Sequence, residues 1–536
     1  MKELKKWVAV ACAATVAFSA AACKKTEKKS AEAPMGDFTL GEDELEFSWY
    51  RNEDAASSKP WKDMGLIANW IKDNLKVTVN FMDPGGSAAE KLAVMIVSDE
   101  FPDVMEMRRG QDANNLIETG KIVPLDEYGK KYTSIYNDYK DNGVIKLLTS
   151  KDGKWYQIPN WANSSGNPNG NDGWFLNKKI YEEMGSPKLE TFDELYSYLK
   201  AVKSKYPNII PFDSGNQFTA EEMVFAGMLE DNSTEYITNM SYPKGDKLEL
   251  IFKNPAYREA MVYINRLFND KLISQDAFTQ THDQAMEKWS NGTAAVMTGN
   301  ISDNAAKGRI NLVPQGNDWL IINPVHKSGL DGSKITCETY NTLGWDIHMI
   351  TKDAKNPQGI YAFLDYIYSP EGQSLMGYGP KGMYYDDFDE NGFPNLKPSY
   401  FEKSSAEIGQ ELHTFPLPLG NTSFVDSCAM NVYEKTEPDK RDWTKTGQKN
   451  VTWKTSKNVT EFVNFIPSKS TDEGIIYQSL SDIYKEYRAK MVFAKDEAEV
   501  NKLLDSLISE CEAAGADQLL RYQQGVWEFN KKCLAK

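Results

Sequence analysis

The stretch SAAEKLAVMIVSDEFPDVMEMRRG, residues 87–110, decides the fold together with NLIETGKIVPLDEY, residues 115–128. A half-buried helix is predicted over residues 88–97, because apolar residues recur there at spacings of three and four. They are Leu92, Met95 and Ile96. Pro102 favours a break after this helix, since the residue before a proline is disfavoured in the helical conformation. A short strand is then predicted from Val104 to Met107.

A polar loop, residues 106–112, follows this strand at its carboxyl end. A second helix is expected to end at Gly120, and residues 122–125 leave it as an extended segment. In open α/β sheets, ligands usually bind outside the carboxyl ends of the strands. The loop is therefore a candidate part of a binding site.

The preceding residues continue the same alternation of strands and helices. Strands are predicted over residues 44–50 and 77–81, and a helix over residues 61–74 lies between them. Strand, helix, strand, helix, strand is the beginning of a doubly wound α/β domain. A strand over residues 343–350 is expected to return to this first domain.

A second α/β unit is predicted from about Trp174 onwards. The strand at residues 174–177 is followed by a helix, and Thr191 with Glu194 forms a capping-box sequence for another helix over residues 192–205. Further on, a strand is predicted over residues 294–297. C-terminal helices are expected to pack on this second unit.

The N-terminus is typical of an export signal. Basic residues precede an apolar segment that ends in small residues directly before Cys23. This arrangement resembles a lipoprotein signal, with cleavage after residue 22 and a lipid such as palmitate on the Cys23 sulfur. Residues 24–34 are charged and suit a solvated tether. The alternative is an ordinary secretory signal in which Cys23 has no role.

Length and charge limit the possible functions. A chain of 536 residues is too long for one core, so two to four domains are expected. The formal net charge of −16 argues against nucleic acid as a partner. No internal segment approaches the roughly 20 apolar residues of a membrane-spanning helix, so membrane contact is expected through a lipid anchor only.

Signals for catalysis and metal binding are weak. The four histidines are scattered, and GxSxG and phosphate-loop patterns are absent. Residues 386–392 (DDFDENG) offer oxygen donors that suit calcium, as do residues 167–172, but the favoured interpretation of both is a solvated loop. No metal or other cofactor is expected, although calcium stays possible. One disulfide and buried free thiols are both compatible with the spacing of Cys337, Cys428, Cys511 and Cys533.

An ordered series of motifs resembles the family 1 extracellular solute-binding proteins that feed ABC importers. The motifs are Pro102-Asp103, GKIVPL at 120–125, DGKWYQIP at 152–159, and an Asn356-Pro357 helix start followed by FLDYIYSPEGQ at 363–373. The resemblance implies a two-lobed, type II periplasmic-binding-protein-like α/β fold with a ligand cleft between the lobes and additional C-terminal helices. It places residues 41–153 and about 338–400 in lobe 1, and residues 154–337 and about 401–536 in lobe 2, after a signal peptide at 1–22 and a tether at 23–40.

Aromatic faces and fixed polar groups are what a cleft needs to bind a saccharide. Rings near strand ends and polar residues after strands are the natural candidates. The rings are Trp49, Tyr50, Trp161, Trp174, Trp345, Tyr384 and Tyr385, and the polar residues are Arg51, Asn52, Glu106, Arg108, Arg109 and Asn300. For each ring the alternative is core packing. The paired arginines could instead favour an acidic ligand such as a uronate.

The predicted function is capture of an oligosaccharide by a monomeric lipoprotein on the extracytoplasmic face of the cell membrane. The ligand would pass to the permease subunits of an ABC transporter, and the protein would not be an enzyme. The alternatives are a secreted carbohydrate-active lyase or hydrolase, a peptide-binding protein, and a surface sensor or adhesion lipoprotein.

Overall fold

A computed structural model describes residues 35–535, apart from residues 55, 57, 216, 217, 277 and 414–418 and the side chains of 405 and 406. The predicted signal peptide, Cys23 and most of the tether lie outside the described residues. The described chain from Gly36 onwards is a single compact unit. Within that unit, two sheets with separate cores define a first and a second lobe.

The first lobe is built on a five-stranded sheet with the order β2-β1-β3-β13-β4. Strands β1 (Leu45–Arg51), β2 (Val77–Met82) and β3 (Val104–Arg108) are parallel, as predicted. Strand β13 (Asp346–Ile350) returns to this sheet and pairs antiparallel with β3 and with β4 (Ile158–Pro159). The carboxyl ends of β1 and β3 therefore lie beside the start of β13.

The second lobe is built on a four-stranded sheet with the order β11-β6-β10-β7. These strands are β6 (Asp172–Asn177), β7 (Ile210–Phe212), β10 (Ala294–Asn300) and β11 (Trp319–Ile322). Helix α9 (Phe192–Lys205) has the predicted bounds, and the capping box of Thr191 and Glu194 is present at its start.

The stretch that decides the fold forms the predicted helix, strand and helix. Helix α3 (Ala88–Ser98) begins at Ser87, whose side chain accepts the amide of Glu90, and it is followed by Asp99 in the left-handed conformation. Helix α4 (Gln111–Glu118) follows β3 and ends two residues before the predicted Gly120.

The single helix predicted over residues 61–74 is wrong. The chain forms a short 3-10 turn, η1 (Trp61–Asp63), and then helix α2 (Leu66–Leu75). Gly65 separates them with a φ of 90°, a conformation that glycine adopts at low cost. The apolar spacing continues across both pieces because both pack on the same core, so periodicity alone did not reveal the break.

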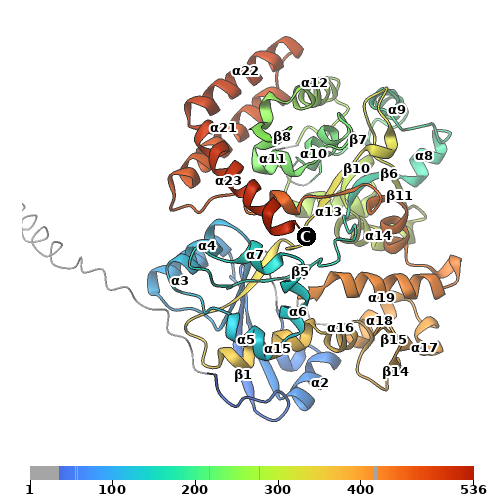
Figure 1. Cartoon of the computed structure of the whole chain (residues 1–536). Coiled ribbons are helices and arrows are strands. Elements are labelled where there is room, and N and C mark those ends of the chain that lie inside the picture. Colours follow the sequence, from blue (N-terminus) through green and yellow to red (C-terminus); the bar gives the residue numbers. More distant parts are fainter. Residues whose placement is uncertain are drawn as a thin grey trace, which may run out of the picture. The chain divides into compact units, whose positions relative to one another are not determined.

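Three C-terminal helices complete the second lobe: α21 (Asp472–Val492), α22 (Glu497–Ala513) and α23 (Ala516–Leu534). They contribute Leu480, Leu504 and Leu519 to its core, as predicted. Figure 1 shows them in red; α21 and α22 contact α12 (Pro255–Asn269), and α23 packs on α21. Cys533 and Leu534 at the end of α23 instead pack against the core of the first lobe, so this helix joins both lobes.

Residues after 400 are divided differently from the prediction. Ile408, Leu412 and Leu419 were expected in the second lobe, but they belong to the core of the first. Their partners there include residues of α15 (Pro357–Tyr368) and α16 (Pro370–Tyr378). The resemblance to the family weakens after residue 400. No motif there indicated to which lobe these residues belong.

Two short parallel pairs lie where the chain passes between the lobes. Strand β5 (Trp161–Ala162) pairs with β16 (Gly420–Asn421), and β12 (Glu338–Tyr340) pairs with β17 (Ser456–Asn458). Strand β5 leaves the first sheet and precedes β6, and β12 precedes β13. These crossing segments bring residues from distant parts of the sequence together.

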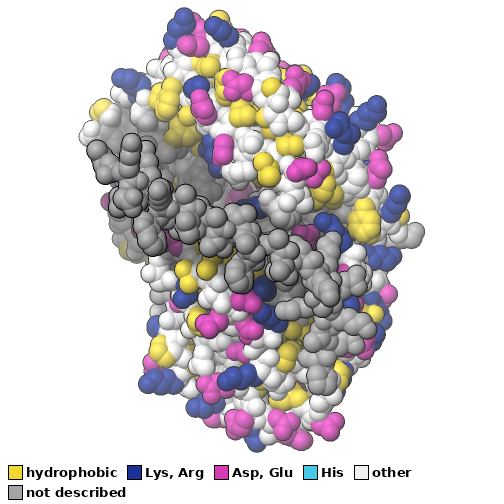
Figure 2. Space-filling view, turned by 90° about the vertical axis from the view of Figure 1, so that its left-hand side faces the viewer, with side chains coloured by type: hydrophobic (Ala, Val, Ile, Leu, Met, Phe, Trp, Pro, Cys, Tyr) yellow, Lys and Arg dark blue, Asp and Glu magenta, His cyan; other side chains and the backbone are white. Residues whose placement is uncertain are grey.

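The described surface is mixed in charge. Acidic and basic side chains are interspersed over the face shown in Figure 2. No helix among the described residues is long and apolar enough to cross a membrane. The four cysteines of the described chain are free thiols, three of them buried, which confirms the free-thiol alternative.

Candidate functional site

Two indole rings form an aromatic step at the junction of the lobes. Trp161 lies in the crossing strand β5, and Trp345 directly precedes β13. Their rings are stacked, with centroids 6.4 Å apart and planes at 24°. Trp161 is half-buried, whereas 48% of Trp345 is exposed. An exposed, fixed indole is a surface on which the apolar face of a sugar ring can stack.

A tight turn holds Trp345 in place. Gly344 has a φ of 60°, and a Cβ there would lie 2.4 Å from Asn160 Oδ1. The same Asn160 oxygen accepts the amides of Trp345 (3.2 Å) and Asp346 (3.1 Å). Arg109 donates from Nη2 to the Gly344 carbonyl at 3.1 Å. The turn therefore requires glycine, and buried polar contacts fix the direction of the indole.

The base of Trp161 is fixed by close packing. A Cβ on Gly420 would lie 2.3 Å from the Trp161 ring, so the glycine backbone lies directly against the indole. Strand β16, which carries Gly420, pairs with β5 beside it. One segment from each of three distant parts of the chain thus builds the aromatic step.

Charged side chains surround this step at the carboxyl edge of the first sheet. Arg108, whose side chain is 68% exposed, forms an ion pair with Asp346 at 3.4 Å. Arg109 is half-buried and donates to Asn464 Oδ1 at 3.2 Å. Burial lowers the pKa of the Arg109 guanidinium, and the charges of Glu235 and Asp346 oppose this shift. Glu235 belongs to the second lobe, so Arg109 lies where the lobes meet.

A buried polar group lies behind this edge. Glu106 is 3% exposed and accepts a hydrogen bond from Trp49 Nε1 at 2.9 Å, while Arg51 Nε lies 3.8 Å away. Burial raises the pKa of Glu106 to about 7 and lowers that of the adjacent His348 to about 3. Arg51, Glu106, Arg108 and Asn300 were predicted in loops, but each of them lies within a strand.

The protonation of Glu106 predicts a pH dependence of folding stability. A carboxyl whose pKa is raised on folding binds its proton more tightly in the folded state, so stability falls as the pH rises between about 4.5 and 7. Glu106→Gln should reduce the stability lost between pH 5 and pH 8 by up to about 3 kcal/mol. Urea unfolding at both pH values measures this loss. The matched control is Glu46→Gln, an exposed position on the same sheet; equal losses in wild type and Glu106→Gln would contradict the prediction.

Carboxylates gather on the side of the second lobe. The amide of Asp172, the first residue of β6, donates to Glu338 Oε2 at 2.7 Å. Burial raises the pKa of both carboxyls, and the charge of Asp172 raises that of Glu338 further. Asn300, at the end of β10, hydrogen-bonds Asp172 through its side chain. Burial and the charge of Asp172 also raise the pKa of Glu222, to about 8.

Seven of the thirteen predicted ligand residues are partly exposed: six lie at the carboxyl edge of the first sheet with the aromatic step, and Asn300 lies beside Asp172 in the second lobe. They are Arg51, Asn52, Arg108, Arg109, Trp161, Asn300 and Trp345. Asn52 belongs to this edge because its amide donates to the Glu106 carbonyl at 2.9 Å. All seven retain some exposed surface.

The remaining predicted rings are corrected to packing roles. Trp49, Tyr50 and Trp174 have no exposed surface, and Tyr384 and Tyr385 are 3% and 4% exposed. Trp49 lies in the first core and Trp174 in the second, where it stacks on Phe212. The two tyrosines pack against Tyr400 and Phe388. Glu106 is buried with them, and its contacts are those described above.

Several polar residues of the region were missed. Glu235, Asn464 and Glu338 occur in segments that carry no motif, whereas Asn160 adjoins the motif at 152–159 and Asp172 ends the loop at 167–172 that was considered for calcium. Asp346 had a signal, because it adjoins Trp345 at the start of a predicted strand. The others reach the region through the crossing segments and the second lobe, which sequence spacing does not reveal.

The two loops considered for calcium make local contacts. In the hairpin of β14 (Tyr385–Phe388) and β15 (Pro394–Leu396), Asp389 Oδ1 accepts the amides of Asn391 and Phe393. In the loop at 167–172, Asn171 Oδ1 accepts from Gln448 at 2.6 Å. Within the described residues, no group of three or more His, Cys, Asp or Glu is placed to hold a metal ion.

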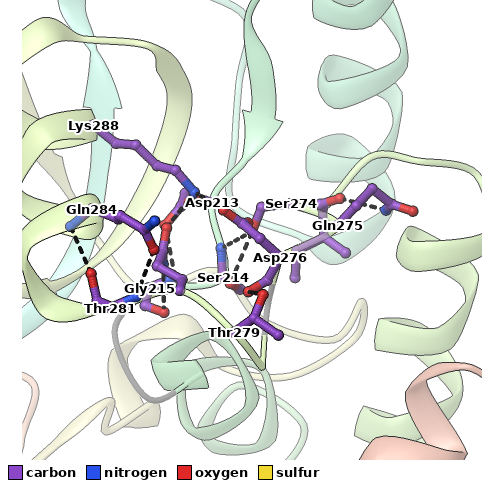
Figure 3. A network of polar contacts seen from close by, with 12 residues as sticks. Asp213, Ser214, Gly215, Ser274, Gln275, Asp276, Thr279, Thr281, Gln284 and Lys288 are labelled. Carbon is purple, nitrogen blue, oxygen red and sulfur yellow. Dashed lines mark hydrogen bonds and ion pairs between the residues drawn. The ribbon is translucent and has the colours of Figure 1, made fainter.

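A second polar network lies at the carboxyl end of β7 (Figure 3). Lys288 Nζ lies between two carboxylates, 2.8 Å from Asp213 and 2.9 Å from Asp276. Ser214 and Ser274 are buried and hydrogen-bonded to each other. The network connects β7 to α13 (His282–Asn291). Its charged side chains form ion pairs with one another, which indicates a structural role.

Comparison with known proteins relates the chain to solute binding. A family model described as bacterial extracellular solute-binding protein matches residues 54–374. A Bacillus subtilis (strain 168) protein, the polygalacturonan/rhamnogalacturonan-binding protein YtcQ, is 23% identical over 378 residues, which are 70% of this chain and 72% of that protein.

Solved structures of similar fold cover nearly the whole chain. The alginate-binding protein AlgQ2, crystallised without calcium ion, has a TM-score of 0.64 and 19% identity, and the match covers 91% of this chain and 99% of AlgQ2. The S. pneumoniae ABC-transporter substrate binding protein FusA, in complex with kestose, gives the same four values. These likenesses show a two-lobed type II fold with additional C-terminal helices.

Proposed function

The chain belongs to the bacterial extracellular solute-binding proteins, and from this premise we propose that it captures an oligosaccharide and delivers it to an ABC importer. The observation that carries the choice of ligand is the aromatic step of Trp161 and Trp345 at the junction of the lobes. A flat exposed ring bordered by fixed charged groups suits the faces and hydroxyls of a sugar. Relatives named for saccharides support the same choice.

Binding would be converted into a signal by movement of the lobes. The crossing segments connect two separate cores, and a ligand held on the aromatic step would contact both lobes. Hinge closure around a ligand is a common motion of two-lobed binding proteins. The closed form would then be the shape that the permease subunits recognise.

The remaining parts of the proposal concern location and assembly. We infer that Cys23 carries a lipid that anchors a monomer to the extracytoplasmic face of the membrane, with residues 24–40 as a tether. The lobe boundaries lie at the crossing segments, with residues up to 419 added to the first lobe because Leu419 packs in its core. The protein would return its ligand unchanged, without catalysis and without a cofactor.

Thermal unfolding of residues 24–536 against a panel of oligosaccharides and peptides tests the proposal. A ligand present at 100 times its Kd should add about 2.7 kcal/mol of stability. A shift with saccharides, which chromatography then recovers intact, is the expected result. A shift with peptides alone would contradict the ligand class, and shortened saccharide products would indicate a lyase or hydrolase.

A further inference from the structure

A cavity of about 440 Å³ lies between α23 and the first lobe. Residues of α4 and α7 (Val144–Leu148) form one of its walls, and α23, which lies beside α7 (Figure 1), forms the other. Neither Trp161 nor Trp345 lines it. The volume is in the range of small-molecule sites, about 300–1,000 Å³, and far exceeds the roughly 30 Å³ that one water molecule occupies in the liquid.

One face of α23 is turned to this cavity. Tyr522, Val526 and Phe529 line it, and their spacing of four and three residues places them on the same face of the helix. The adjacent face, with Leu519 and Trp527, packs in the second core. Phe529 is 51% exposed although it is a large apolar ring. The cavity therefore has an apolar wall with an exposed ring on which a flat molecule can stack.

Two buried amides line the cavity with an oxygen that has no donor. Gln157 and Asn530 are 5% and 1% exposed. The Asn530 Nδ2 group donates to the carbonyls of Glu461 at 3.0 Å and Val463 at 2.8 Å, and Gln157 Nε2 lies 3.4 Å from Asn114 Oδ1. Gln157 Oε1 and Asn530 Oδ1 accept no hydrogen bond from the described residues. Because an unpaired buried acceptor is costly, both oxygens favour a molecule that brings hydrogen-bond donors.

The charged side chains at the cavity pair with each other. Lys151 Nζ lies 3.0 Å from Glu118 Oε1, and the two side chains are 83% and 36% exposed. The other residues that line the cavity are uncharged. An ionic ligand would therefore meet no unpaired counter-ion there, and burial of an unpaired charge is unfavourable. The walls suit a neutral molecule with hydroxyl groups and an apolar ring face.

We propose that this cavity is a second binding site, which takes a small neutral polyhydroxy molecule such as a monosaccharide or a cyclic polyol. Hydroxyl groups of the ligand donate to Gln157 Oε1 and Asn530 Oδ1, and its ring face lies on Phe529. The ligand contacts both lobes. This inference goes beyond the capture of an oligosaccharide and does not depend on it, because neither indole of the aromatic step lines the cavity.

Saturation-transfer NMR of residues 24–536 tests the proposal with glucose, galactose and myo-inositol as probes. At least one probe is expected to bind with a Kd of about 1–10 mM, which is ordinary for a ligand of about twelve non-hydrogen atoms. Trp345→Ala should bind the same probe with an affinity within about twofold of wild type, since the ring lies outside the cavity.

A bulky side chain at Gly525 should block the site. Gly525 lines the cavity within α23, and a Cβ there would meet no atom within 4 Å. Gly525→Trp should weaken binding of the probe at least tenfold, and the helix should tolerate it because glycine is itself unfavourable in a helix interior. The matched control is Gly377→Trp, at an equally open glycine of α16 outside the cavity, which should bind like wild type.

Gln157→Leu tests the buried acceptor without filling the cavity. It removes an oxygen that has no partner among the described residues and retains a side chain of similar size, so the melting temperature should not fall. Binding of the probe should weaken at least fivefold. A residue with a structural role alone would show the opposite pattern, a lower melting temperature with unchanged binding.

The outcomes separate this inference from the proposed function. Absence of binding by all three probes would overturn the second site, as would wild-type affinity in folded Gly525→Trp and Gln157→Leu. Binding that Trp345→Ala removes and Gly525→Trp leaves intact would place the probe on the aromatic step and would also overturn it. A protein that binds a probe in the cavity but no oligosaccharide would lose the proposed function and retain the second site.

Discussion

Trp345→Ala is expected to weaken oligosaccharide binding by about 30-fold, or about 2 kcal/mol, which is typical of a tryptophan at the centre of a binding surface. The ring is 48% exposed and its outer surface is free to stack on a sugar. Folding stability should fall by only about 1 kcal/mol, since the ring is half exposed and loses its stacking on Trp161. Calorimetric titration with the best ligand of the panel measures the affinity, and urea unfolding measures the stability.

Two variants serve as controls for this result. Trp345→Phe retains a flat ring and should recover part of the affinity. Phe529→Ala removes a ring of similar exposure, 51%, from α23. Phe529 lines a cavity of about 440 Å³ between α23 and the first lobe, which includes Asn464 but neither indole of the aromatic step. A larger loss of affinity in Phe529→Ala than in Trp345→Ala would place the ligand in that cavity instead.

Trp174→Ala should destabilise the protein by about 3–5 kcal/mol, the cost of removing a large ring from a packed core. Trp174 has no exposed surface; its ring stacks on Phe212 with centroids 5.4 Å apart and lies 6.4 Å from Phe192. Stability at 25 °C from urea unfolding measures the effect. At temperatures where the variant is folded, its affinity for saccharide should stay within about threefold of wild type.

This result would decide between the two interpretations of Trp174 that the sequence allowed. Trp174→Phe is the matched variant, because it retains a ring that can contact Phe212, and it should lose less than half as much stability. A stable Trp174→Ala protein that no longer binds saccharide would show that the ring does belong to the site.

Local sequence signals predicted the parallel strands of the first sheet and one helix in each lobe well. The strand at 104–107, the helix after Ser87 and the capping box at Thr191 each depend on residues close in sequence, which is why their positions agree with the structure. The break at Gly65 was missed because the apolar spacing continues through it.

Exposure of the aromatic residues was harder to predict. Trp49 lies within one strand and Trp345 directly before another strand of the same sheet, yet Trp49 is fully buried and Trp345 is half exposed. The difference depends on which segments cover each ring, and that is a property of the assembled lobe. For Trp174 a signal did exist, since it begins the continuous apolar run WFL, which is typical of a strand buried on both faces.

The polar part of the site could not be predicted because its members are distant in sequence. Asn160 and Gly344 are brought together by the crossing segments, and Asn464 meets Arg109 across more than 350 residues. Only pairing between strands and packing between lobes produce these contacts.

Both cores are completed late in the chain, and this has a consequence for how the protein is made. The first core includes Leu419 and Val463, and the second includes Leu519 and Trp527. During synthesis from the N-terminus, at roughly 5–20 residues per second, neither core can close until these segments have emerged. The growing chain therefore lacks part of each core through most of translation, which suits the export that we propose for it.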